Sequence, residues 1–307
     1  MEPGKRPSPR PSRSDRPAYL RCMNRIRTIA ILTGWTLFFP ALSSGSDISL
    51  RISSGLGWLK AHEINRALTS WREGWVLRAE SDPELGLEGR TGRFLHVETD
   101  FEAELLLSFS RWLALGVSAG YAYASLDEEQ TLVSTRQEGI VYEQARPTKI
   151  SAYPVFLSIY LSLPISKKVN VYIRGGGGAV FASYVVREAN KKAGTARYTY
   201  TTYNNATARR WSYLGSIGLS YAVDPSIGFF VEAAARWAQV SGFVAEDDLG
   251  GSSRLYTYEE YQPDIDFWQL RTSLHPEEPG GSSVRNVREA TVDFSGYSAR
   301  IGIFLKF

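Results

Sequence analysis

Apolar and polar residues alternate with a period of two through much of the sequence after Asp47. The C-terminal segment shows the pattern most completely. Every second residue from Tyr297 to Phe307 is apolar, and the residues between them are mostly Gly, Ser, Arg or Lys. Such alternation is typical of a β-strand whose two faces meet different environments. The pattern predicts strands at residues 48–58, 97–109, 113–123, 155–163, 169–181, 211–223, 227–237 and 296–307.

The composition of the two faces favours a membrane barrel over a soluble sandwich. One face of each predicted strand is apolar and tends to carry aromatic residues near its ends, which is typical of a surface in contact with lipid. The opposite face consists mainly of Gly, Ser and Ala with isolated charges. A soluble sandwich needs large apolar side chains on its inner face, whereas these small residues suit a narrow lumen.

The lengths of the connections support the same prediction. Short links occur at residues 110–111, 164–168 and 224–225, and long links at about 60–95, 125–147, 184–209 and 240–290. Short and long links alternate, which is typical of the periplasmic turns and extracellular loops of outer-membrane barrels. We therefore predict an all-β fold, an eight-stranded antiparallel up-and-down transmembrane β-barrel. The start of the first long link, residues 62–75, has helical character.

The first 45 residues differ from the rest of the chain. Residues 1–22 are rich in Arg, Pro and Ser and predict either a disordered extension or a segment that precedes the true start codon at Met23. Residues 23–45 contain a basic stretch, a short apolar run and small residues, which predicts a signal peptide; an N-terminal membrane anchor is the alternative. Residues 46–307 then form the barrel domain with four long loops. The single cysteine, Cys22, lies before the apolar run.

Charged residues on the polar faces predict an ion-pair network inside the barrel. The second predicted strand places four carboxylates on its inner face, and arginines come from four other strands. Opposite charges in a narrow lumen with little water should pair with one another. We favour a salt-bridged plug over an ion path, because a small barrel has little free cross-section. The predicted network comprises Arg51, Glu98, Asp100, Glu102, Glu104, Arg174, Glu232, Arg236 and Arg300.

The last eight residues, Arg-Ile-Gly-Ile-Phe-Leu-Lys-Phe, carry the resemblance to a known family. The segment is similar to the assembly signal of the OmpA-type outer-membrane β-barrel superfamily, in which the OmpA-like and OmpW-like members are small eight-stranded barrels. The resemblance implies a Gram-negative-type outer membrane with both termini periplasmic. It also implies contact with lipid and lipopolysaccharide, and recognition by periplasmic chaperones and the assembly machinery. The implied signal residues are Arg300, Gly302, Leu305 and Phe307.

Composition gives little support for other kinds of function. The formal net charge of +3 provides no basic surface for a nucleic-acid partner. The three histidines, at positions 62, 96 and 275, do not have the spacing of a metal site or of a catalytic pair. The glycine run 175–178 is not followed by a helix, so it does not resemble a phosphate loop. We therefore expect no cofactor, no metal and no enzymatic activity.

The long loops are where recognition of an extracellular ligand is expected. Their aromatic residues could bind such a ligand, or could pack the loops onto each other. We expect a structural or surface-recognition role, including adhesion; the alternative is an OmpW-like small channel for hydrophobic or small solutes. Pro154 removes a backbone donor from the fourth strand, which predicts a bulge and weakly favours a lateral opening. The loop candidates are Tyr198, Tyr200, Tyr203, Tyr256, Tyr258, Tyr261 and Trp268.

Overall fold

The computed structural model of the chain describes residues 47–82, 86–90, 95–137, 140–192, 199–246 and 251–307. The predicted extension at residues 1–22 and the predicted signal peptide at 23–45 lie outside these ranges. The described residues form one compact unit, Asp47–Phe307.

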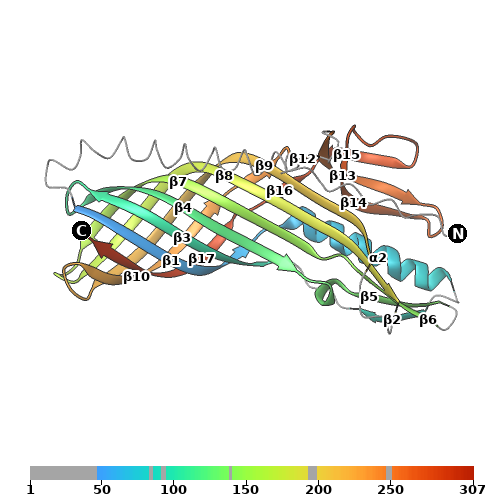
Figure 1. The fold of residues 1–307 in the computed structure, drawn as a ribbon, viewed down its shortest axis with the longest axis horizontal. Helices are drawn as coiled ribbons and strands as arrows, with labels where there is room; N and C mark the ends of the chain where they lie inside the picture. The colour runs from blue at the N-terminus through green and yellow to red at the C-terminus, as the bar shows by residue number, and fades with distance from the viewer. Residues whose placement is uncertain (1–46, 83–85, 91–94, 138–139, 193–198, 247–250) are drawn as a thin grey trace, which may run out of the picture. The chain divides into compact units, whose positions relative to one another are not determined.

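Eight antiparallel strands close into a barrel, as the sequence predicts (Figure 1). Each strand pairs with the next along the chain, and the last strand, β17, pairs with β1. The long links contribute shorter strands outside this ring, so the strand numbers of the barrel are not consecutive. The barrel strands are β1 (Asp47–Leu59), β3 (Val97–Ser108), β4 (Leu113–Leu126), β7 (Thr148–Pro164), β8 (Val169–Lys192), β9 (Thr199–Ala222), β10 (Ile227–Trp237) and β17 (Gly296–Lys306).

The outer surface of the barrel is an apolar band with aromatic residues at both edges. Alternate residues of every strand point outward, and large aliphatic side chains such as Leu56, Leu157 and Ile301 are 60–65 % exposed. Trp58, Trp211 and Tyr297 are exposed near one edge, and Phe229 and Phe307 near the other. A band of this kind, bounded by two rings of aromatic residues, matches the lipid-facing surface of an outer-membrane barrel.

One end of the barrel, called here the turn end, consists of three tight turns and the two ends of the barrel chain. Ser110, Ser166 and Asp224 each accept two backbone N–H bonds within their own turn, which is how these residue types favour turns. Asp47 pairs with Ser108, and the N–H of Phe307 donates to the carbonyl of Ile48 at 2.9 Å. Both ends of the barrel chain therefore lie beside the short turns.

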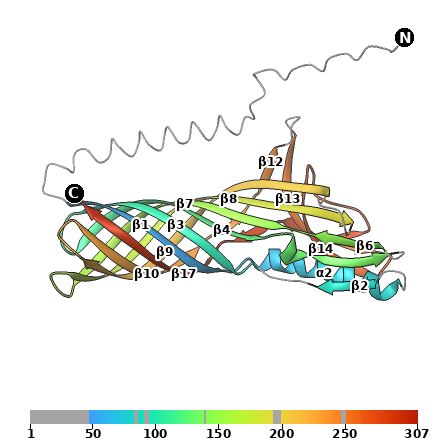
Figure 2. The same ribbon diagram turned by 60° about the horizontal axis from the view of Figure 1, so that its bottom comes forward.

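The four long links meet at the other end, called here the loop end. Most residues of the links at 125–147, 184–209 and 240–290 are themselves in strands. β8 and β9 continue pairing well past the apolar band, and additional strands attach to both of them (Figure 2). The added elements are β2 (Gly86–Arg90), η2 (Glu129–Thr131), β5 (Val133–Gln137), β6 (Ile140–Ala145), β11 (Gln239–Ser241), β12 (Val244–Glu246), β13 (Ser252–Gln262), β14 (Phe267–His275), β15 (Val284–Glu289) and β16 (Thr291–Asp293).

A helix, α2 (His62–Ser81), follows β1, as the helical character of residues 62–75 predicts. It lies against β14. Ile64, Ala67 and Leu68 form its buried stripe at helical spacing. Glu63 in the first turn pairs with Arg288 of β15 at 2.8 Å. No helix in the described part of the chain is long and apolar enough to cross a membrane. Helix α2 and the added strands together are called the loop-end assembly below.

Pro154 does not produce the expected bulge. β7 keeps one register with β8 from Thr148 to Pro164. With β4, Ala152 pairs with Ala122 and Val155 pairs with Ala119, so no residue is inserted between them. Between these two pairs, Tyr153 and Pro154 of β7 are not paired with β4, because a proline has no N–H to donate. The prediction of a bulge at Pro154 is therefore wrong.

Candidate functional site

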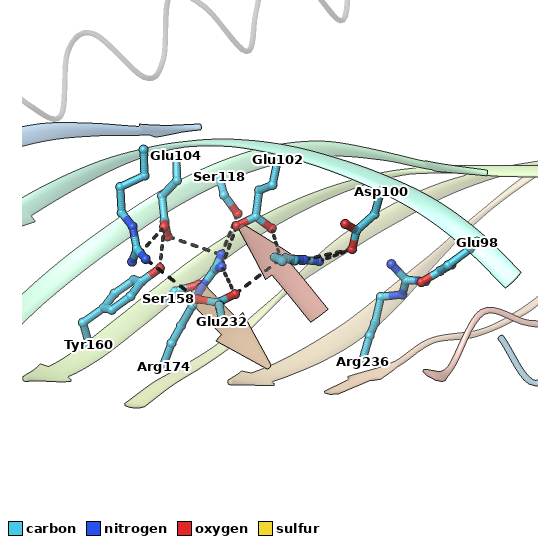
Figure 3. A network of polar contacts seen from close by, with 12 residues as sticks. Glu98, Asp100, Glu102, Glu104, Ser118, Ser158, Tyr160, Arg174, Glu232 and Arg236 are labelled. Carbon is cyan, nitrogen blue, oxygen red and sulfur yellow. Dashed lines mark hydrogen bonds and ion pairs between the residues drawn. The ribbon is translucent and has the colours of Figure 1, made fainter. Parts of the chain in front are cut away.

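The lumen is the candidate functional site, and the register of β3 explains how its carboxylates reach it. Glu98, Asp100, Glu102 and Glu104 point inward at every second position (Figure 3). On β1 their cross-strand partners are Gly57, Gly55, Ser53 and Arg51, of which three are small. A Cβ on Gly55 would lie 2.7 Å from both Asp100 Oδ1 and Arg300 Cγ. The small residues therefore leave the space that the charged side chains occupy.

The structure brings the nine predicted ionisable residues into the lumen. Arg51, Arg174, Arg236 and Arg300 arrive from four different strands, and Glu232 arrives from β10. All nine residues are at most 7 % exposed. Because five carboxylates face four guanidinium groups, hydroxyl donors must supply part of the hydrogen bonding.

Arg174 is at the centre of the network. Its Nη1 lies 2.5 Å from Glu102 Oε1 and 3.7 Å from Glu232 Oε1, and its Nη2 lies 3.3 Å from Glu104 Oε1. Its Nε donates to Ser158 Oγ at 3.0 Å, and Nη2 donates to Ser118 Oγ at 2.9 Å. One guanidinium group thus joins three carboxylates and two hydroxyls, which satisfies a charge that would be costly to bury alone.

Arg300 extends the network toward the loop end. Its Nη2 lies 2.8 Å from Asp100 Oδ2, and its Nη1 lies 3.1 Å from Glu102 Oε2 and 3.6 Å from Glu232 Oε1. Glu102 and Glu232 are therefore shared between Arg300 and Arg174. Shared partners of this kind hold several strands together at one depth of the barrel.

Arg51 has the longest ion pairs and the most aromatic contacts. Its guanidinium nitrogens lie 3.9 Å from Glu104 and 4.0 Å from Glu232. It donates a hydrogen bond to the Tyr172 hydroxyl, and its Cζ lies 3.9 Å from the centroid of the Phe230 ring. Cation–π contacts gain strength when the cation is desolvated, so the rings replace part of the missing carboxylate contact.

Glu98 and Arg236 form a separate pair. Arg236 Nη2 donates to both carboxylate oxygens of Glu98, at 2.6 and 2.8 Å. Arg236 Nε donates to the carbonyl of Phe294 at 3.0 Å. The nine residues are thus divided into a network of seven and this pair, which Figure 3 shows to one side of the network.

The sequence analysis did not assign the hydroxyl partners. Tyr160 donates to Glu104, Tyr172 donates to Glu232 at 3.1 Å, and Ser118 and Ser158 both bind Arg174. A signal was present, because these residues lie on the predicted inner faces and Tyr172 pairs across β9 with Gly218. A large polar residue opposite an inward glycine indicates a side chain that extends into the lumen.

Apolar layers fill the lumen on both sides of the network. Toward the turn end, Ala114, Tyr160 and Tyr172 form a buried cluster against Leu106. Toward the loop end, the inward side chains of the barrel merge with those of the long links into one hydrophobic core. Members of that core include Leu59, Leu126, Ile150, Phe156, Val180, Val186, Val240, Phe243, Leu255 and Phe294.

The predicted assembly-signal residues all lie on or beside β17. Arg300 points inward into the network, and Gly302 lies against the Phe230 ring. Leu305 is partly exposed, and Phe307 is 78 % exposed at the turn end. Their role as a signal for the assembly machinery stays a prediction, because such a signal acts before the barrel has formed.

The loop tyrosines have different environments. Tyr256 and Tyr258 are buried, so they pack the links onto each other and are not exposed for binding an extracellular ligand. Tyr261 and Trp268 are partly exposed, with ring centroids 5.2 Å apart, and the hydrogen bond from Tyr261 to Asp266 raises the pKa of the tyrosine. Tyr198 lies outside the described residues. Tyr200 and Tyr203 lie on β9, where only the backbone is described.

Trp268 borders a hollow between α2 and β14. The hollow has a volume of about 350 Å³, and its lining includes Arg66, Glu73, Glu259, Phe267 and Trp268. Arg285 pairs with Glu259 at 2.7 Å and lies 3.9 Å from the centroid of the Trp268 ring. A hollow of this volume falls within the lower part of the range of small-molecule sites, about 300–1,000 Å³.

The histidines lie apart from one another. His96 stacks on Trp58 with a centroid distance of 4.7 Å, and His275 contacts the hydroxyls of Ser273 and Tyr258 at 2.8 and 3.1 Å. Within the described ranges, no group of three or more His, Cys, Asp and Glu side chains is placed to hold a metal ion. His62 lies at the start of α2 and borders the hollow.

Comparisons with known proteins give a family and a fold. The family described as the OmpA-like transmembrane domain matches residues 104–279, more than half of the 307 residues. The curated proteins include no match. Among solved structures, OprG of Pseudomonas aeruginosa is similar, with 11% identity and a TM-score of 0.40, over 86% of this chain and 97% of OprG.

Two further solved structures are similar at comparable levels. Ail, the attachment invasion locus protein of Yersinia pestis, was solved with the heparin analogue sucrose octasulfate. It is 10% identical, with a TM-score of 0.35, over 85% of this chain and 97% of Ail. Neisserial surface protein A is 9% identical, with a TM-score of 0.32, over 86% of this chain and 99% of that chain.

Proposed function

Since the chain belongs to the family of the OmpA-like transmembrane domain, we propose that this outer-membrane barrel has a closed lumen and acts in surface recognition or adhesion. The lumen serves stability, and the loop-end assembly provides the recognition surface. The observation that supports this division is the filling of the lumen, where buried ion pairs lie between two apolar layers.

The contacts of the network argue against conduction. A water-filled pore keeps charged side chains hydrated, whereas every ionisable residue of this network is buried and bound to protein partners. A buried ion pair offsets its desolvation cost only when its geometry is good and its remaining donors and acceptors are also bound. An ion crossing this lumen would have to break several of these contacts in sequence.

The asymmetry of the two ends supports an orientation with the loop end outside the cell. Outer-membrane barrels have short periplasmic turns and longer extracellular loops. Here the turn end has three tight turns, and the loop end has α2 and the added strands. With this orientation, both ends of the barrel chain are periplasmic and the apolar band contacts lipid and lipopolysaccharide.

Cysteine labelling on intact cells tests the orientation. The chain has one native cysteine, Cys22, so an introduced thiol is the only one among residues 23–307. We expect a membrane-impermeant maleimide to label Glu278→Cys, at an exposed site of the loop end, and not the matched variant Lys167→Cys in an exposed turn. Labelling of Lys167→Cys alone on intact cells would reverse the orientation and remove the basis for surface recognition.

The exposed Phe307 at the end of β17 supports a further partner, the outer-membrane assembly machinery. Deletion of Phe307 should reduce insertion into the outer membrane while export to the periplasm continues. Fractionation and a heat-modifiability gel measure the two steps separately. Insertion of the truncated chain at the rate of the full chain would exclude Phe307 from the signal.

A small channel is the second candidate function, and one observation favours it. The pairing of β4 with β7 is incomplete beside Pro154, and an incomplete ladder is the place where a barrel wall opens at the lowest cost. A lateral path would deliver an apolar solute to the bilayer without crossing the ion pairs. Cross-linking β4 to β7 with a disulfide beside Pro154 should abolish uptake if such a path exists, and leave surface binding unchanged.

A further inference from the structure

A small recess beside α2 contains a buried arginine, Arg146, whose polar contacts are fewer than those of Arg174 in the lumen. The recess has a volume of about 120 Å³ and lies where α2 and β14 meet β8 and the link before β7. Helix α2 contributes Trp71, Trp75 and Arg78, and the other elements contribute Arg146, Glu188 and Arg271.

Helix periodicity explains how α2 lines the recess. Trp71, Trp75 and Arg78 are spaced by four and three residues, which places them on one face. The helix comes close to β14 at Gly74, where an added Cβ would lie 3.0 Å from Gln269 Nε2. Trp71 and Trp75 thereby line the same recess as Arg271 of β14 and Arg146 of the link before β7.

Arg146 has few partners for its degree of burial. Its side chain is 6 % exposed. Its Nη2 donates to the Thr272 carbonyl at 3.4 Å, and its Nε lies 3.9 Å from Glu188 Oε1. A guanidinium group has five N–H donors, and burying such donors without partners costs free energy. With the described residues as partners, these two contacts leave several of the five Arg146 donors unused, and the side chain borders the recess.

Arg78 and Arg271, the two other arginines of the recess, bind partners that do not line it. Arg78 donates to Asp264 and Gln262, at 2.9 Å in each case, and Arg271 pairs with Glu260 at 2.7 Å. The Arg78 guanidinium lowers the pKa of Asp264, so that carboxylate stays charged. These contacts fix the positions of both guanidinium groups. Among the residues that line the recess, Glu188 is the one carboxylate beside three arginines.

We propose that the recess binds an oxyanion group, a carboxylate or a phosphate, of an extracellular ligand. This inference rests on the proposed function, because it requires the loop-end assembly to face outside. At about 120 Å³ the recess is smaller than the usual range of ligand sites, about 300–1,000 Å³, so it accepts one group of a ligand. Arg146 donates to the oxyanion, and the Trp71 and Trp75 rings contact the part of the ligand that carries it.

Calorimetric titration of the refolded full chain tests the proposal with three probes. Glucuronate offers a carboxylate on a sugar ring, inorganic phosphate offers the oxyanion alone, and glucose is the neutral control. We expect saturable binding of glucuronate, of phosphate or of both, none of glucose, and weaker binding at high salt. Stronger binding of glucuronate would identify an acidic sugar as the source of the oxyanion. Stronger binding of phosphate would identify a phosphate ester as the source.

Two matched variants assign the binding to the recess. Arg146→Gln should reduce affinity at least about 10-fold, because it removes charge-assisted hydrogen bonds from the oxyanion. Arg254→Gln removes an exposed guanidinium of the same assembly, outside the recess, and should bind as the unchanged chain does. Arg271→Gln provides a third variant in case Arg146→Gln fails to fold, which a heat-modifiability gel detects; it should also weaken binding.

Two results would overturn the proposal. One is the absence of saturable binding of both anions, which would mean that water fills the recess. The other is an affinity for the bound anion that is the same in Arg146→Gln, Arg271→Gln and the control Arg254→Gln. Either result leaves the proposed function standing if Glu278→Cys is still labelled on intact cells, whereas failure of that labelling would remove the proposed function itself.

Discussion

Arg174 in the lumen and Arg146 in the loop-end assembly are both buried, and they differ in how well their donors are satisfied. Arg174 has three carboxylates and two hydroxyls within 3.7 Å. Arg146 has one carbonyl at 3.4 Å and one carboxylate at 3.9 Å. A satisfied buried charge indicates a structural element, whereas a buried charge with unused donors indicates a place for a ligand.

The largest expected effect tests the lumenal side of this comparison. Arg174→Ala leaves Glu102, Glu104 and Glu232 without their shared partner. Breaking a buried ion pair on one side costs about 3–5 kcal/mol, because the remaining charge is uncompensated. Urea unfolding in lipid vesicles measures the loss. Arg209→Ala, at an exposed arginine of β9, is the control, and a similar small loss for both variants would contradict the structural role of the network.

A somewhat smaller effect tests the wall that surrounds the network. Ile301 points outward in the apolar band and is 65 % exposed. Ile301→Arg should cost about 2–4 kcal/mol in a bilayer, the range for a charge near the midplane of a barrel. Ile301→Leu is the matched control and should have little effect. If Ile301→Arg is as stable as the unchanged protein in bilayers, the outward face of β17 does not meet lipid.

A double-mutant cycle on the isolated pair sharpens the comparison further. Glu98 and Arg236 have no ion pair with the network of seven, so their coupling can be measured alone. Glu98→Gln and Arg236→Met should each destabilise the barrel, and the double variant should recover about 0.5–3 kcal/mol relative to the sum of the two losses. Strict additivity of the two losses in urea unfolding would show that the pair is not coupled.

The smallest expected effect concerns pH and the loop-end assembly. Partial burial lowers the pKa of His275, so the unfolded chain binds a proton at a higher pH than the folded chain does. The stabilising contribution is therefore present above the ordinary histidine pKa of about 6.5 and is lost as pH falls through the lowered value. The opening constant of β13 and β14, measured by hydrogen exchange after correction for the intrinsic exchange rate at each pH, should rise as the pH falls from about 7 to about 5.

The variant His275→Gln serves as the control for this pH effect. It should make the opening constant of β13 and β14 nearly independent of pH over the same range, while the opening constants of β3 and β17 in the barrel are the same in both proteins. An unchanged rise in His275→Gln would assign the effect to another group of the loop-end assembly.

The barrel could be predicted from the sequence because its order is periodic and local. Alternation determines which side chains of a strand share a face, and that alone placed Glu98 to Glu104 and the four arginines in one lumen. The individual ion pairs could not be predicted in the same way. They depend on strand register, which sets Arg51 opposite Glu104 and Gly55 opposite Asp100.

The loop-end assembly could be predicted only in part, for a physical reason. β13 and β14 pair with each other as a hairpin, but β14 also packs against α2, which lies far away in the chain, and the buried residues of the two strands do not alternate clearly. The burial of Tyr256 and of Arg146 follows from these long-range contacts, including the docking of α2 on β14. The sequence of the link that contains Arg146 does not carry that information.

Single-channel recording of the refolded full chain in planar bilayers tests the central claim, a lumen closed by its own ion pairs, most directly. The proposed closed lumen predicts no steady current from the unchanged protein, because buried ion pairs and apolar side chains occupy the barrel interior. Arg174→Ala should admit water and give a small, flickering conductance. A large, steady conductance from the unchanged protein would contradict a closed lumen and favour the channel.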